Sequence, residues 1–112
     1  MTTAVFPDLK DASVFVTGGA SGIGATLVEG FSAQGAKVAF ADLVDGNDCA
    51  DGIANRTGNR PLPLQADVTD LAALRLALGR AAEAHGTITV LVNNAAWDDR
   101  KGALDVDEAY WD

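Results

Sequence analysis

Four glycines stand close together directly after an apolar run near the start of the chain. Residues 14–17 read V-F-V-T and are followed by G-G-A-S-G-I-G over residues 18–24. Such a run is typical of a buried strand, and a glycine-rich turn leading into a helix presents bare backbone N–H groups to an anion. The positive end of the helix dipole lies at the same point. The pattern therefore predicts a site for phosphate groups.

The glycines have different predicted roles. Gly18 and Gly19 let the chain reverse without a steric penalty at Cβ. Gly22 leaves room for a pyrophosphate at the helix N-terminus, and Gly24 lets that helix approach the strand closely. The alternative is an ordinary turn, because glycine clusters mark turns in many proteins.

An acidic residue follows the next apolar run at a distance that has a chemical meaning. Asp42 stands 18 residues after Gly24. A carboxylate there accepts hydrogen bonds from the hydroxyls of an adenosine ribose and repels a 2′-phosphate. Its expected neighbours carry no positive charge: Gly19, Ala20, Leu43 and Val44. The prediction is NAD rather than NADP. The alternative is that Asp42 starts a turn or caps the next helix.

Alternating strands and helices are predicted to position these groups. Strands are expected at 13–17, 37–41, 62–66 and 88–92, and helices at 22–34, 47–56 and 70–85. Each crossover is long enough for a parallel return, and such units are right-handed. We therefore predict an α/β fold, a three-layer Rossmann-type parallel sheet of order 3-2-1-4 with helices on both faces. The ligand would lie at the carboxyl ends of the strands.

Periodicity predicts which helix faces are buried. Ile23, Leu27 and Phe31 recur every four residues and are expected to lie on the sheet. In the last helix the expected stripe is Leu71, Leu74, Leu78, Ala81 and Ala82. His85 is expected to act as a cation or donor near the C-terminal carbonyls of that helix.

Two motifs together resemble a known family. The sequence T-G-G-A-S-G-I-G is similar to the T-G-x-x-x-G-I-G signature of the short-chain dehydrogenase/reductases. The segment N-N-A-A at 93–96 resembles their N-N-A-G, with Ala96 in place of glycine. The resemblance implies a nicotinamide cofactor. The residues expected to bind it are Thr17, Gly18, Ser21, Gly22, Ile23, Gly24, Asp42, Leu43, Asp67, Val68, Asn94, Ala95 and Ala96.

The resemblance also assigns roles at the later strand ends. Asp67 would accept the exocyclic amine of the adenine, and the backbone of Val68 would meet the ring. Asn93 would tie the central strands together, while Asn94 would face the cofactor ribose. The alternatives are that Asp67 and Thr69 cap the next helix, and that the two asparagines form an ordinary turn.

The last residues resemble one subset of the family. Residues 97–112 are similar to a segment of bacterial sugar dehydrogenases that oxidise aldoses at C1. Asp98, Asp99 and Arg100 match that segment, as does Y-W-D at 110–112, whereas Trp97 and Lys101 depart from it. The substrate implied is a sugar or a secondary alcohol.

The family's catalytic groups have no counterpart in these 112 residues. Hydride transfer there relies on a Ser, on Tyr and Lys in Y-x-x-x-K, and on an Asn. Tyr110 has no lysine four residues further on. We therefore assign no catalytic residue and expect 1–112 to be one partial dinucleotide-binding domain, the first half of a larger oxidoreductase that oligomerises when complete. A non-catalytic NAD-binding regulatory module is the alternative. An S-adenosylmethionine methyltransferase is disfavoured by the N-N-A-A segment.

Composition excludes several other classes. A net charge of −8 disfavours nucleic acid and anionic membrane surfaces as partners. No leader or membrane-length apolar run is visible, which predicts a cytoplasmic protein. Cys49 is the single cysteine, so an internal disulfide is excluded. Asp45, Asp48 and Asp51 lack the spacing of a calcium loop, and no metal site is predicted.

Overall fold

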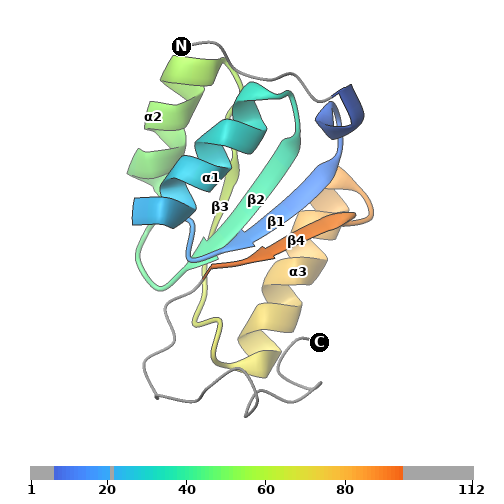
Figure 1. The fold of residues 1–112 in the computed structure, drawn as a ribbon. Coiled ribbons are helices and arrows are strands. Elements are labelled where there is room, and N and C mark those ends of the chain that lie inside the picture. Colours follow the sequence, from blue (N-terminus) through green and yellow to red (C-terminus); the bar gives the residue numbers. More distant parts are fainter. Residues whose placement is uncertain (1–6, 21, 95–112) are drawn as a thin grey trace.

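The computed structural model describes residues 7–20 and 22–94. A short 3-10 turn, Pro7–Leu9, precedes the elements of the sheet. The strands are β1 (Ser13–Thr17), β2 (Lys37–Asp42), β3 (Leu62–Gln65) and β4 (Val90–Asn93). The helices are α1 (Gly22–Ala33), α2 (Asn47–Thr57) and α3 (Leu71–His85). Figure 1 shows strands and helices alternating along the chain.

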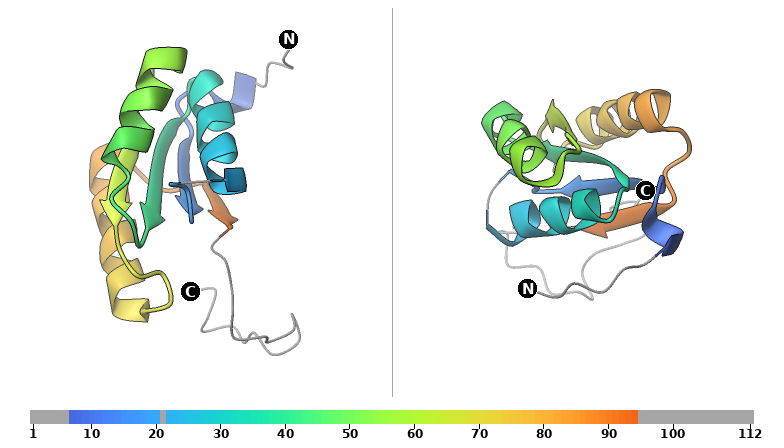
Figure 2. Two further views of the ribbon diagram at one scale, coloured as in Figure 1. Left: turned by 90° about the vertical axis from the view of Figure 1, so that its left-hand side faces the viewer. Right: turned by 90° about the horizontal axis from the view of Figure 1, so that it is seen from above.

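All four strands run parallel, in the order β3-β2-β1-β4. The carboxyl ends of the strands therefore meet at one edge, where the chain leaves β1, β2, β3 and β4 (Figure 1). Helices α1 and α2 pack on one face of the sheet, and α3 covers the other (Figure 2). The predicted Rossmann-type order with helices on both faces is confirmed.

The alternation of side chains along β1 and β2 divides the core into two clusters. The cluster beneath α1 and α2 contains Val14, Val16, Val28, Ala36, Val38, Phe40, Ala50 and Ile53. The cluster beneath α3 contains Phe15, Ala39, Ala41, Ala77 and Ala81. Every residue of β1 is buried. This is expected of a central parallel strand with helices on both sides.

The buried stripe of α1 differs from the predicted one. Ile23 is 74% exposed, and the buried residues of the helix are Gly24, Val28 and Ser32. The stripe is rotated by one residue because the helix meets the turn after β1 through Gly24, which is small enough for the closest approach. The prediction from Ile23, Leu27 and Phe31 was therefore wrong at its first position. Phe31 still packs at the edge of the core.

The stripe of α3 is likewise centred on small residues. Ala77 and Ala81 are buried, Leu74 and Leu78 are half-buried, and Ala82 is exposed. The structure thus corrects Ala82 and adds Ala77, which the apolar pattern did not single out. Alanine allows the helix to lie close to Ala39 and Ala41 of β2.

The outer strands and the cap of α3 also differ in detail. As predicted, β3 is an edge strand with prolines at 61 and 63. Strand β4 begins at Val90 rather than at residue 88, and Leu91 is 49% exposed because β4 forms the other edge. The N-cap of α3 is Asp70, whose carboxylate accepts the N–H groups of Ala72 and Ala73. Within the described residues, no helix combines the length and the hydropathy that a membrane span requires.

Candidate functional site

The glycine-rich turn lies at the carboxyl end of β1 and leads into α1. Gly18 and Gly22 have φ angles of +69° and +59°. Both lie in the left-handed region that favours glycine. The N–H of Gly18 donates to the carbonyl of Ala41 at 2.7 Å, which fastens the start of the turn to β2. The strand, turn and helix therefore follow one another as the sequence predicts.

Gly24 and Gly22 have opposite surroundings. A Cβ at Gly24 would stand 1.8 Å from the carbonyl oxygen of Gly18 and 2.7 Å from Nδ2 of Asn94. A Cβ at Gly22 would meet no atom of the described residues within 4 Å. Gly24 is thus the contact of the helix with the turn, whereas Gly22 borders open space at the N-terminus of α1. That end of a helix of 12 residues presents N–H groups and a positive dipole to an anion.

Asp42 connects the end of β2 to the glycine turn. Its Oδ2 accepts the N–H of Ala20 at 3.1 Å, and its Oδ1 accepts the N–H of Val44 at 3.3 Å. Asp42 therefore does start a turn, which was one of its alternative roles. It does not cap the next helix, because the N-cap of α2 is Gly46 and the carboxylate that accepts the first N–H of that helix belongs to Asp45. An ionised carboxylate has about four lone-pair sites, so the two bonds leave capacity for further donors.

Thr17 joins the ends of β1 and β4. Its hydroxyl donates to Oδ1 of Asn93 and accepts the N–H of Asn94, each at 2.9 Å. The side-chain amide of Asn94 donates to the carbonyl of Gly18 at 3.4 Å. The two asparagines are therefore built into the junction of the strands, and Asn94 is held against the glycine turn.

Asp67 occupies a turn of its own after β3. Its Oδ1 accepts the N–H of Thr69 at 2.9 Å and the hydroxyl of Thr69 at 2.5 Å, and these bonds lower the pKa of Asp67. The expectation that Asp67 and Thr69 cap α3 was wrong, because Asp70 takes that role. Val68 packs against the cluster beneath α3.

The predicted site residues that the structure describes lie in two places, around the glycine turn and after β3. Gly18, Gly24, Asp42 and Asn94 are joined directly or through one neighbour, with Gly22 at the start of the adjoining helix. Ile23 and Leu43 are 74% and 64% exposed beside them. Asp67 and Val68 follow the neighbouring edge strand. Ser21, Ala95, Ala96 and the segment 97–112 lie outside the described residues.

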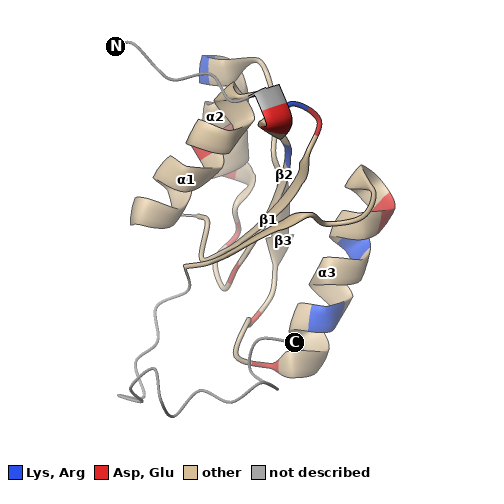
Figure 3. Cartoon of the chain, turned by 45° about the vertical axis from the view of Figure 1, so that its right-hand side comes forward, with Lys and Arg blue, Asp and Glu red and all other residues tan. Residues whose placement is uncertain are grey.

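The charged residues that the structure describes in the loops after β1, β2 and β3 are all acidic. The described residues of the loops after β1, β2 and β3 contain no Lys or Arg, and Figure 3 shows acidic rather than basic segments there. Basic segments are visible on α3 (Figure 3). The prediction that no cation stands beside Asp42 therefore agrees with the arrangement of the described loops.

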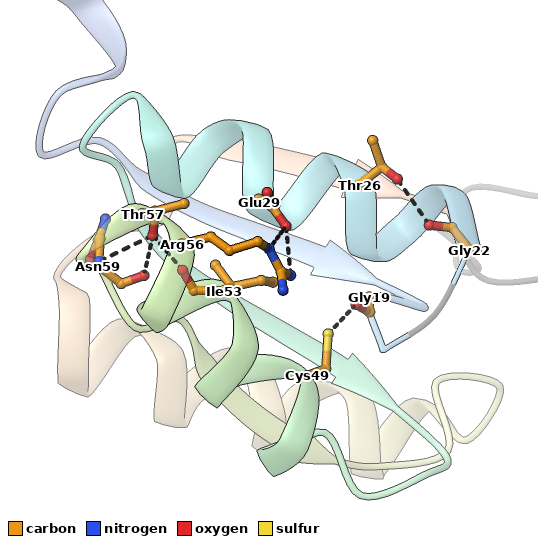
Figure 4. A network of polar contacts seen from close by, with 9 residues as sticks. All are labelled: Gly19, Gly22, Thr26, Glu29, Cys49, Ile53, Arg56, Thr57 and Asn59. Atoms are coloured by element: carbon orange, nitrogen blue, oxygen red, sulfur yellow. Dashed lines mark hydrogen bonds and ion pairs between the residues drawn. The ribbon is translucent and has the colours of Figure 1, made fainter.

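Two contacts at the glycine turn were not foreseen. The thiol of Cys49 on α2 donates to the carbonyl of Gly19, with 3.8 Å between sulfur and oxygen (Figure 4). Burial raises the pKa of the Cys49 thiol. Phe40 of β2 lies directly beneath Gly19. The sequence contained a signal for Phe40. This residue stands two positions before Asp42, so the two side chains lie on the same face of the strand.

Two of the remaining acidic candidates have structural partners. Asp45 accepts from the backbone and side chain of Asn47, and Asp51 pairs with Arg60 at 3.0 Å. No group of three metal-ligating side chains occurs within residues 7–20 and 22–94. Burial and the nearby Lys37 lower the pKa of His85, which disfavours the cation, one of the two roles expected for this residue.

Comparison with known proteins decides the family. The sequence model of the short chain dehydrogenases matches residues 12–112. The chain belongs to this family. A probable galactose dehydrogenase of Rhizobium meliloti is 46% identical over 114 residues, covering 100% of this chain and 44% of that protein. A D-xylose 1-dehydrogenase of Caulobacter vibrioides is 43% identical and is covered to the same extents, 100% and 44%.

A solved short-chain dehydrogenase confirms the fold. The enzyme of Burkholderia cenocepacia, in complex with NADP, has a TM-score of 0.73 and 35% identity, covering 89% of this chain and 42% of that one. The chain therefore spans less than half the length of these relatives. The site described above thus comprises the glycine-rich turn, the end of β2 and the two asparagines at the end of β4 in a member of this family.

Proposed function

We propose that this chain is the NAD(H)-binding part of a short-chain dehydrogenase that oxidises a sugar or a secondary alcohol. The observation that carries the proposal is Asp42. Its carboxylate ends β2, is fastened to the glycine turn through Ala20, and has no cation in the adjoining described loops. An acid so placed accepts hydrogen bonds from the 2′- and 3′-hydroxyls of an adenosine ribose.

The glycine turn and the N-terminus of α1 have features that suit a dinucleotide. The open space at Gly22, next to the N-terminus of α1, suits a pyrophosphate. In this proposal Gly18, Ser21, Gly22 and Ile23 line the pyrophosphate, and Asp42 and Leu43 hold the adenosine ribose. Gly24 supports the turn by its close approach to Gly18. Asp67 and Val68 meet the adenine, while Thr17, Asn94, Ala95 and Ala96 form the side toward the nicotinamide ribose.

The preference for NAD over NADP follows from charge. A 2′-phosphate would bring negative charge to the carboxylate of Asp42, and Leu43 and Val44 beside it offer no compensating cation. The Burkholderia relative is in complex with NADP. Membership of the family therefore leaves the choice of cofactor open, and the residues around Asp42 support the proposal of NAD.

The substrate proposal rests on the relatives. The two named above are galactose and xylose dehydrogenases. The bound nicotinamide would accept a hydride from the sugar or alcohol carbon. The Ser, Tyr and Lys expected for the accompanying proton transfer have no counterpart in these 112 residues. We therefore propose that residues 1–112 form a partial dinucleotide-binding domain that binds the cofactor and by itself transfers no hydride.

A comparison of nucleotide affinities tests the cofactor proposal. We expect NADH to bind more tightly than NADPH. Asp42→Asn should narrow the ratio of the two affinities about tenfold, because the charge-assisted hydrogen bond to the ribose of NADH and the repulsion of the 2′-phosphate of NADPH are both lost. Asp45→Ala is the matched control, since Asp45 is an exposed acid of the same loop that bonds to Asn47. Equal affinities in the unaltered protein would contradict the role of Asp42.

Turnover tests the remainder of the proposal. We expect no NAD reduction by the 112-residue chain with galactose, xylose or a secondary alcohol. A complete protein containing this sequence should oxidise at least one of them. Measurable turnover by the 112-residue chain would contradict the proposal that the catalytic groups lie outside these residues.

A further inference from the structure

The ring of Phe40 fills the space between two glycines that belong to different loops of the site. A Cβ at Gly19 would lie 2.6 Å from Cβ of Phe40, and a Cβ at Gly46 would lie 2.5 Å from Cε2 of the same side chain. Phe40 is 1% exposed. One side chain therefore limits how closely both loops can approach the sheet.

The two loops carry different parts of the proposed ligand site. Gly19 precedes Ala20, whose N–H bonds the carboxylate of Asp42. Gly46 ends the loop that follows Asp42 and is the N-cap of α2. The near end of the ring thus supports the phosphate-binding turn, and its far edge supports the loop on the ribose side.

A second side chain also borders the position that a Cβ would take at each glycine. A Cβ at Gly19 would lie 2.9 Å from Cγ2 of Val28, and a Cβ at Gly46 would lie 3.2 Å from Cβ of Pro63. Protein interiors are packed to crystal density, so such a loop cannot shift without a change in the side chain that fills the gap. The loops are positioned by the volume of the ring rather than by hydrogen bonds alone.

We propose that Phe40 is a positioning residue for the dinucleotide, setting the separation between the glycine turn and the loop after Asp42. The inference rests on the proposed function, because the separation matters only if one ligand spans both loops. A rigid ligand whose pyrophosphate and ribose are held at two points is sensitive to the distance between them. A smaller side chain at position 40 would let both loops move inward.

The first test compares two buried phenylalanines in the 112-residue chain. Phe40→Leu removes the far edge of the ring, and Phe15→Leu makes the same change on the opposite face of the sheet, in the cluster beneath α3. Both variants should lose stability. NADH affinity, measured by fluorescence titration and corrected for the folded fraction from circular dichroism, should fall about tenfold in Phe40→Leu. It should fall less than about twofold in Phe15→Leu.

The second test approaches the ring from the glycine side. Gly46→Ala presses a methyl group against the ring edge and should weaken NADH binding, whereas Gly79→Ala is a control because a Cβ at Gly79 meets nothing within 4 Å. Gly46→Ala and its control Gly79→Ala test the role of Phe40 if Phe40→Leu does not fold. In Phe40→Leu/Gly46→Ala the methyl group occupies the vacated space, and affinity should return to within about threefold of the unaltered protein.

The outcomes separate the two proposals. If the unaltered chain binds neither NADH nor NADPH, the proposed function fails, and the role of Phe40 fails with it. If the unaltered chain binds NADH but Phe40→Leu and Phe15→Leu weaken binding equally, the role of Phe40 is overturned and the function stands. Additive effects of Phe40→Leu and Gly46→Ala on affinity would also overturn it.

Discussion

The two faces of the sheet are built in different ways. Beneath α1 and α2 the core uses large side chains, including Phe40, Val28 and Ile53, and the helices are joined by an Arg56–Glu29 ion pair at 2.7 Å (Figure 4). Beneath α3 the buried residues are Phe15 and four alanines. The first face carries the contacts of the glycine turn with Val28, Phe40 and Cys49. The second carries a single helix.

The difference shows that the packing on one face also builds the candidate site. The loops after β1 and β2 rest on the side chains of the α1 and α2 face, so a change of volume there alters both stability and ligand geometry. On the α3 face, Leu76 is 60% exposed and Leu91 49% exposed. Changes at these two exposed side chains should affect stability weakly and the glycine turn hardly at all.

The largest contrast is expected between two glycine-to-alanine changes. In Gly24→Ala the new methyl group would overlap the carbonyl of Gly18, so we expect a loss of about 3 kcal/mol or more in the free energy of unfolding. Gly79→Ala on α3 should gain about 0.5–1 kcal/mol, because alanine is the better helix former and has open space. Urea unfolding measures both. A Gly24→Ala protein as stable as the unaltered one would disprove the close contact.

A second contrast is between one buried and one exposed aliphatic side chain. Ile53 on α2 is 1% exposed, and Ile53→Ala should cost about 2–4 kcal/mol from lost burial and the cavity left behind. Leu76→Ala on α3 should cost less than about 1 kcal/mol. Thermal unfolding of the two variants checks this order. Similar losses would mean that the α3 face is packed as tightly as the other.

A third, smaller effect distinguishes the helix caps. Asp70→Ala removes the side-chain bonds to the first turn of α3 and should cost about 1 kcal/mol in unfolding free energy. Asp48→Ala in the first turn of α2 is the control, because Asp48 is exposed and the first N–H of that helix is bonded by Asp45 instead. Its effect should stay below about 0.5 kcal/mol. Equal losses would remove the distinction between the helices.

The smallest effect is a pH dependence at the end of α3. Burial and Lys37 lower the pKa of His85 below its ordinary value of 6.5. The unfolded chain then binds the proton more tightly, so this residue makes the free energy of unfolding fall as the pH drops below 6.5. We expect His85→Gln to flatten that part of the stability curve between pH 7.5 and 5.5. An unchanged slope would contradict the assignment.

The sequence alone predicted the sheet order because its signals are local. Each apolar run is bounded by turn residues, and the lengths between the runs permit parallel crossovers. The glycine turn was predicted for the same reason, since its residues are consecutive. Asp42 was found through its distance from Gly24. The cofactor contacts themselves remain predictions.

Packing details could not be predicted because they depend on residues far apart in the sequence. The stripe of Gly24, Val28 and Ser32 carries little hydrophobic signal, whereas Ile23 carries a strong one and lies exposed. The contacts of Phe40 with Gly46 and of Cys49 with Gly19 are through-space neighbours. His85 looked like a helix-end cation, and only its burial beside Lys37 lowers the pKa.

The position of β1 has a consequence for synthesis of the protein. This strand is made first, yet Val14 pairs with Val38 on one side and with Val90 on the other. The N–H of Asn94 reaches the hydroxyl of Thr17 across 77 positions of sequence. A nascent chain therefore carries an unfinished turn and an open central strand until residue 94 has left the ribosome. During that interval the strand is a template for mispairing, which gives molecular chaperones a defined segment to protect.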